Sequence, residues 1–216
     1  IIAYNHAQDF NKSYDLYTRL EQIADTEELR FEAQLGGMRS AYRIGNSQAV
    51  YGLANKVSSN PNATELQRAT ANFYIGKIAY DRNDFTAALT AFNETIRLSD
   101  NEQTAEARYL RAMIYYQRRD LARAQELTLA ANRESSGYPY WVAKSVILLS
   151  DIFVEQGDLY NGRAALEALL ENYNEDPVVV QEARDKLARV NSLINQGSRL
   201  DRTDPNQLQF EGGGGQ

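Results

Sequence analysis

A short turn recurs along this chain at nearly constant spacing and limits what the chain can fold into. It occurs at Gly45-Asn46, Asn83-Asp84, Arg119-Asp120 and Gly157-Asp158, at intervals of 36 to 38 residues, and Gln8-Asp9 lies 37 residues before the first. The first residue of each turn stands where a helix ends in left-handed geometry, and the second can cap the next helix. The spacing therefore predicts a series of helical hairpins with one such turn in each.

Apolar stripes at helical spacing flank these turns. Around Asn83-Asp84 they comprise Ile75, Gly76 and Ala79 before the turn and Phe85, Ala88 and Phe92 after it. No single hairpin of this size buries its apolar face, so neighbouring hairpins must stack. The predicted fold is all-α: an α-α superhelix, or solenoid, of about four helical hairpins with a leading half-repeat and a C-terminal capping helix.

Loop signals between the hairpins divide the chain. We expect one repeat domain over residues 1–196, and residues 197–216 form a flexible tail because apolar periodicity stops there and four glycines follow. The parts are a half-repeat (1–25), units at about 26–60, 64–100, 104–136 and 140–174, and a cap helix at 177–196. The chain begins almost in the second helix of a unit, so it looks like a fragment of a longer protein.

The small and aromatic positions of these units resemble the tetratricopeptide repeat (TPR) family. The matching residues are Gly76, Phe85, Ala88 and Phe92 in one unit, Ala112, Tyr115, Leu121, Ala124 and Ala131 in the next, and Ser150, Phe153, Leu159, Gly162 and Leu166 in the last. Met38, Val50 and Arg111 depart from the pattern, and the spacing exceeds the usual period of about 34 residues. The segment 140–173 is similar to TPR proteins of bacterial outer-membrane assembly and Tol-Pal accessory systems. That resemblance implies a periplasmic or outer-membrane-associated location, with a cytoplasmic one left open.

Composition argues against several functions. The net charge is −6 with both signs interspersed, so we expect no nucleic-acid partner. No stretch of about 18 apolar residues predicts a membrane span, and the chain has no cysteine. Its one histidine, His6, has no neighbour that would make a catalytic or metal site. We therefore expect no enzymatic activity, no cofactor and no bound metal.

In TPR proteins the first helix of each unit lines a concave groove, so residues at matching positions of those helices form columns there. The partner-binding residues that this resemblance implies are Leu35, Arg39, Tyr42, Phe73, Lys77, Tyr80, Tyr109, Met113, Tyr116, Ile147 and Asp151. One column changes from basic Arg39 and Lys77 to acidic Asp151. This gradient would either orient a partner or be solvated without one. The lysine, asparagine and arginine clamp of chaperone-binding TPR domains has no counterpart at these positions, which favours an apolar or aromatic ligand.

The leading hypothesis is a non-enzymatic scaffold that binds a protein or peptide in this groove, as part of an envelope or outer-membrane assembly or secretion complex. Two alternatives stay open: a structural spacer or self-association segment, in which case a homo-oligomer forms, and regulatory repeats of a multidomain protein. The tyrosines have two interpretations as well, since they either face a ligand or pack between repeats. Leu208, Gln209 and Phe210 are a further candidate, as a docking motif in the tail.

Overall fold

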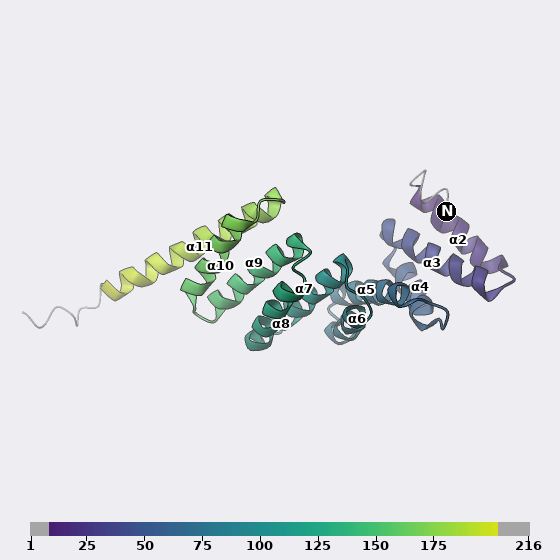
Figure 1. Ribbon diagram of the computed structural model, residues 1–216, viewed down its shortest axis with the longest axis horizontal. Coiled ribbons are helices and arrows are strands. Elements are labelled where there is room, and N and C mark those ends of the chain that lie inside the picture. The colour runs from purple at the N-terminus through teal and green to yellow at the C-terminus, as the bar shows by residue number, and fades with distance from the viewer. Residues whose placement is uncertain (1–8, 203–216) are drawn as a thin grey trace, which may run out of the picture. The chain divides into compact units, whose positions relative to one another are not determined.

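The computed structural model describes residues 9–202, with side chains through residue 196 (Figure 1). His6 and the proposed tail motif at Leu208 to Phe210 lie outside the described residues. Within that range the chain is helical, with short connections and no strand. The helices are α2 (Phe10–Ile23), α3 (Glu27–Arg43), α4 (Ser47–Ser59), α5 (Glu65–Asp81), α6 (Phe85–Leu98), α7 (Glu102–Gln117), α8 (Leu121–Glu134), α9 (Pro139–Glu155), α10 (Leu159–Asn172) and α11 (Pro177–Arg202).

The recurring turn has one geometry at the four positions that lie wholly within the described residues. Gly45, Asn83, Arg119 and Gly157 have φ angles of 74°, 60°, 64° and 83°. In the turn of α5 and α6, the Asp84 amide donates to the Ala79 carbonyl at 2.9 Å and the Asn83 amide to that of Tyr80 at 2.9 Å, which is the double bond of a Schellman motif. The Asp84 carboxylate then accepts from the Ala87 amide at 3.1 Å and caps α6. Asn46, Asp120 and Asp158 cap α4, α8 and α10 in the same way.

The other helix starts follow equally local rules. Thr26 caps α3, and Thr64 and Gln67 form a capping box at α5. Asp176 accepts from the amides of Val178 and Val179 at the start of α11. Each of these bonds joins residues two or three positions apart, so the sequence carries the helix boundaries locally.

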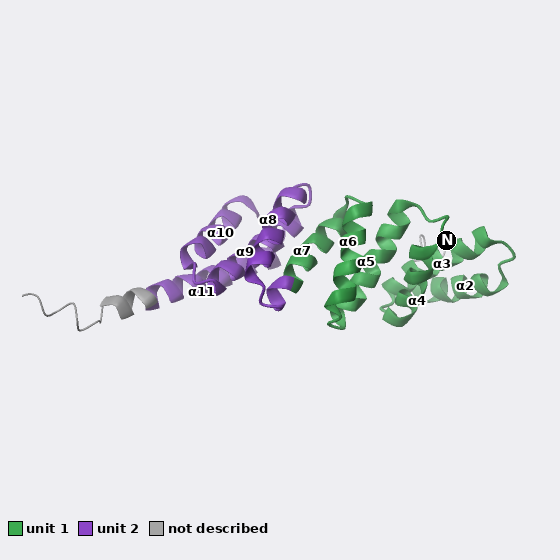
Figure 2. Ribbon diagram, turned by 90° about the horizontal axis from the view of Figure 1, so that it is seen from below, with its two compact units in different colours: residues 1–114 green, residues 115–216 purple. Residues whose placement is uncertain are grey.

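The chain divides into two compact units, residues 1–114 and 115–216, with the boundary inside α7 (Figure 2). In the first unit α3 packs with α4 and α5 with α6, while α2 packs on α3 and α4 on α5. Its core includes the fully buried side chains of Met38, Val50 and Phe92. Gly76 lets α6 approach α5 closely, because a Cβ there would lie 2.6 Å from Cδ1 of Phe92.

In the second unit α8, α10 and α11 all pack against α9, and α10 also packs against α11. The core includes Leu166, Ala183 and Val190. Ser150 donates a hydrogen bond to the Gly162 carbonyl at 2.8 Å, where α9 and α10 approach each other through small residues.

The predicted fold class is confirmed: the structure is all-α and built from successive helical hairpins. One boundary differs from the prediction. Helix α11 continues to Arg202, whereas the loss of apolar periodicity placed its end at residue 196. A helix needs apolar side chains only where it packs, so an end placed by the apolar pattern is too early. The single repeat domain over 1–196 stays a prediction.

Candidate functional site

The predicted binding residues fall into a buried layer and an accessible layer. Leu35, Phe73 and Ile147 are 3%, 2% and 3% exposed and belong to the cores of their units. They therefore do not present an accessible surface, although they are at the expected positions on α3, α5 and α9. Tyr109 and Tyr80 are half-buried and pack against the first unit's core. Tyrosine packing between neighbouring helices, one of the two interpretations above, describes these two rings.

The accessible layer of the first unit comprises Arg39 and Tyr42 on α3 with Lys77 on α5; we name it the α3–α5 face. The ring of Tyr42 is 41% exposed and stacks on that of Tyr74, with centroids 4.2 Å apart and planes at 16°. Stacking holds the ring in place while one side remains accessible. Arg39, one helical turn before Tyr42, is exposed and forms no ion pair with another described residue.

Lys77 is held by a carboxylate from the next first helix. Its Nζ donates to Oε1 of Glu106 on α7 at 2.5 Å, and both side chains are half-buried. Burial by itself would lower the pKa of Lys77, but the hydrogen bond and charge of Glu106 outweigh it, and Tyr42 and Asp81 add to them, so the pKa is raised. Lys77 is thus a fixed cation beside Tyr42.

Tyr116 and Asp151, the predicted residues of the second unit that remain accessible, meet in a small hollow of about 130 Å³ between α7, α9 and α11. The Tyr116 hydroxyl donates to Oε1 of Glu155 at 2.6 Å, and Arg119 pairs with the other oxygen of that carboxylate. Burial raises the pKa of Tyr116; the charge of Asp151 adds to this, while Arg119 and Arg189 oppose it.

The acidic end of the predicted charge column is neutralised. Lys186 on α11 donates to both carboxylate oxygens of Asp151 at 2.7 Å. The sequence interpretation placed Asp151 at the acidic end of a gradient because it compared only the first helices of the units and did not include α11, which supplies Lys186. The gradient is therefore weaker than predicted, since each carboxylate here has a cationic partner. Met113, on α7 in the first unit, is half-buried.

The partners that sequence reasoning missed follow a rule that the sequence contains. Lys56 pairs with Glu21 across 35 residues, Lys186 with Asp151 across 35, and Lys144 with Glu182 across 38. Opposite charges one repeat apart meet because stacked helices bring equivalent positions side by side. A search for opposite charges at the repeat spacing would have found these pairs.

The described residues hold no cluster of three or more histidine, cysteine, aspartate or glutamate side chains suited to a metal ion. Over the same residues, no helix is both long enough and apolar enough to cross a membrane. The accessible features of the predicted site are thus an aromatic ring and fixed charges, which are groups suited to binding.

The family comparison agrees with this geometry. A family model described as tetratricopeptide repeat matches residues 65–139, which span α5 to the start of α9. Over these residues the chain is similar to tetratricopeptide repeats. TPR domains are in general protein-interaction scaffolds without enzymatic activity. No curated protein matches the chain.

Solved structures with similar folds include one that is described as a TPR protein. BtubC (BKLC) from P. vanneervenii is 12% identical with a TM-score of 0.61, covering 96% of this chain and 95% of that one. A thermophilic TPR protein of Thermus thermophilus is 16% identical with a TM-score of 0.50, covering 87% and 95%. At these identities the likeness concerns the fold alone. The N-terminal domain of stress-induced protein-1 (STI-1) from C. elegans is 20% identical with a TM-score of 0.48, covering 59% and 98%.

Proposed function

We propose that this TPR protein is a non-enzymatic scaffold that binds a segment of another protein on the α3–α5 face. The observation that carries the proposal is Tyr42: a large ring, 41% exposed, held flat against Tyr74 beside the cations Arg39 and Lys77. Aromatic and arginine side chains dominate the energetics of protein interfaces. A ring already fixed by stacking loses little conformational entropy when a partner covers it.

The chemistry of this face indicates the kind of partner it suits. Lys77 is neutralised by Glu106, whereas Arg39 forms no ion pair within the described chain. A segment with an apolar or aromatic side chain over Tyr42 and a carboxylate near Arg39 would satisfy both groups. We extend the proposal to a location in the bacterial envelope, on the basis of the resemblance of residues 140–173 to envelope TPR proteins.

The test is capture of partners by the purified protein from an extract of bacterial envelope, with photo-crosslinking to preserve weak complexes. The variant Arg39→Ala/Tyr42→Ala should reduce capture of each specific partner at least tenfold, because it removes the ring and the arginine. Tyr160→Ala is the matched control: Tyr160 is 63% exposed, on a second helix, with Arg163 over its ring. If the double variant captures each partner as well as the parent protein does, the α3–α5 face is not the binding site. The same conclusion follows if Tyr160→Ala reduces capture equally.

A further inference from the structure

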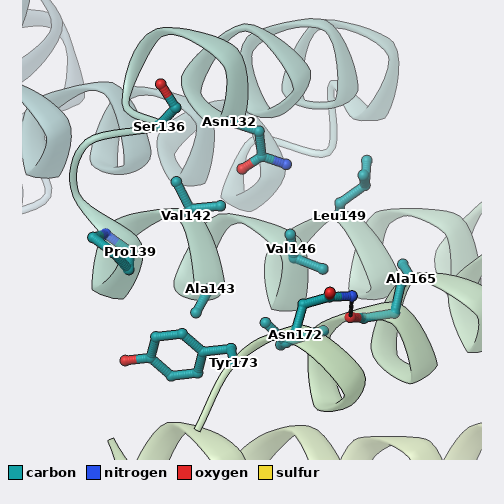
Figure 3. A pocket seen from close by; sticks show the side chains of 12 residues that line it. Asn132, Ser136, Pro139, Val142, Ala143, Val146, Leu149, Ala165, Asn172 and Tyr173 are labelled. Atoms are coloured by element: carbon teal, nitrogen blue, oxygen red, sulfur yellow. Dashed lines mark hydrogen bonds between the residues drawn. The ribbon is translucent and has the colours of Figure 1, made fainter. Parts of the chain in front are cut away.

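An apolar pocket of about 480 Å³ lies in the second unit (Figure 3). It is bounded by α8, α9 and α10, and both α8 and α10 pack against α9. The buried side chains of Ala143, Leu149 and Leu169 form its floor, and Val142 and Val146 line it from α9. Its volume lies within the range of ligand-binding pockets, roughly 300–1,000 Å³.

Asn132 is one reason that the pocket exists. Counted from the capping residue of its helix, its position on α8 corresponds to Ile96 on α6 and Leu170 on α10. Both of those side chains pack against the core of their unit. An amide in their place on α8 supplies less apolar volume and brings a polar group to a surface that is otherwise apolar.

Ala165 is a second reason. Its position on α10 corresponds to Leu127 on α8 and Leu53 on α4, counted from the same capping residues. Leu127 is 6% exposed, and Leu53 packs against the first unit's core. At these two positions α4 carries Ser58 and α6 carries Ala91, so a polar or small residue is not confined to the pocket. The pocket lies where α8 has the polar residue and α10 has the small one, so neither helix supplies a large apolar side chain there.

The polar groups of the pocket define what it can hold. No charged side chain lines it. Oδ1 of Asn132 is buried and has no hydrogen-bond partner among the described residues, and the amide is directed toward the α9 side chains that line the pocket. A buried acceptor without a donor is costly, so a ligand that supplies a donor gains from this atom. An uncharged, mostly apolar group with one N–H or O–H donor fits both observations.

We propose that this pocket is a second binding site, which takes a tryptophan side chain from a partner protein. Tryptophan has the largest apolar surface among side chains that carry a single donor, and its indole N–H can reach one acceptor. Insertion covers the apolar lining and donates to Oδ1 of Asn132. The site does not depend on the α3–α5 face, so either one can fail while the other stands.

The test titrates the full chain with indole and with indene, which has the same bicyclic shape without the N–H. Methyl NMR signals of Val142 and Val146 report binding in the pocket. We expect indole to shift both signals with a Kd on the order of 1 mM. Indene should bind about three- to tenfold more weakly because it leaves the Asn132 acceptor without a donor. Equal or tighter binding of indene, or shifts confined to residues outside the pocket, would overturn the donor assignment.

Variants separate filling of the pocket from general damage. Ala165→Leu places in the pocket the residue that α8 and α4 carry there and should abolish the indole shifts. Ala164→Leu is the matched control, since it makes the same change at the exposed neighbouring position of α10 and should leave them intact. If Ala165→Leu does not fold, Asn132→Leu, which copies Leu170, replaces it with the same expectation.

N-acetyl-tryptophanamide tests whether the ligand is part of a protein. It should compete with indole at the same valine signals, because the pocket opens between exposed positions at Pro139 and Ala168. If indole binds but the amide does not, the site takes a free small molecule and the partner protein is refuted. If Ala165→Leu retains full indole binding, the pocket itself is refuted.

Discussion

Two glycines at helix-interior positions offer a sharp test of the packing in the first unit. Gly76 on α5 faces the Phe92 ring, so that a Cβ would lie 2.6 Å from both Cδ1 and Cε1 of that ring. Gly52 on α4 has no atom within 4 Å of the corresponding position. The same substitution, glycine to alanine, should therefore have opposite effects at the two positions.

The magnitudes follow from two opposing contributions. Alanine favours a helix interior over glycine by about 1 kcal/mol, so Gly52→Ala should raise the free energy of unfolding by about that amount. At position 76 the added methyl overlaps a fully buried ring that also contacts Phe73, at 6.5 Å between centroids. Overpacking of this kind costs about 3 kcal/mol, at the upper end of its usual range. Gly76→Ala should then lower the free energy of unfolding by about 2 kcal/mol.

The assay is urea denaturation of the full chain followed by far-UV circular dichroism. Fluorescence of Trp141, the single tryptophan, follows the second unit separately. Gly76→Ala in a Phe92→Leu background should lose its cost, because the overlapping ring carbons are gone. Two results would refute the close approach of α5 and α6. The first is that Gly76→Ala is as stable as Gly52→Ala. The second is that Gly76→Ala lowers the free energy of unfolding by the same amount in the Phe92→Leu background.

Three further predictions concern the turns and one ion pair. Arg119→Gly should raise the free energy of unfolding by about 1 kcal/mol in urea denaturation, because glycine adopts the left-handed backbone conformation without strain. Loss of the ion pair with Glu155 should cost little, because Arg119 is exposed. Arg119→Ala, which removes the same pair but keeps the strain, should show no such gain. Asp84→Ala should cost about 1 kcal/mol by removing the cap of α6, and Asp84→Asn should restore most of it in thermal unfolding. Burial opposes ionisation of Glu21, but hydrogen bonds and charge, chiefly from Lys56, outweigh it and lower the pKa of Glu21. Its contribution to stability is thus present above a pH of about 4.3 and lost as the pH falls through the lower folded value. Glu21→Gln should lose less stability than the parent protein as the pH falls. If the urea midpoints of the two proteins depend on pH in the same way, the pairing of Glu21 with Lys56 is contradicted.

The sequence by itself determined the hairpins and their boundaries. The Asp84 carboxylate caps α6 by accepting from the backbone amide three residues later. At the turns of Gly45 and Asn83, the backbone hydrogen bonds that end the preceding helix join residues at most five positions apart. These signals depend only on residues that are close in sequence, so they can be recognised without a structure. The repeat spacing then predicted the all-α fold, which the structure confirms.

The candidate site was only partly predictable. Position in the repeat identified Leu35 and Tyr42 as members of one face, but one is 3% and the other 41% exposed. That difference in exposure depends on the position of the neighbouring helix, and no local sequence pattern predicts that position. Likewise, Asp151 was interpreted as the acidic end of a charge column, whereas Lys186 from α11 neutralises it.

Tertiary structure alone decided which groups are left without a partner within the described part of the chain. Arg39 forms no ion pair with another described residue, while Lys77 pairs with Glu106. The buried Oδ1 of Asn132 lies at an apolar pocket that Ala165 lines from α10. The physical reason is the separation in sequence. The bonds that cap and end helices join residues two to five positions apart, whereas the burial and the ion pairs of Lys77 and Asp151 depend on different helices. Local chemistry therefore fixed where the hairpins turn and which residues cap their helices, and packing between helices fixed what each side chain can contact.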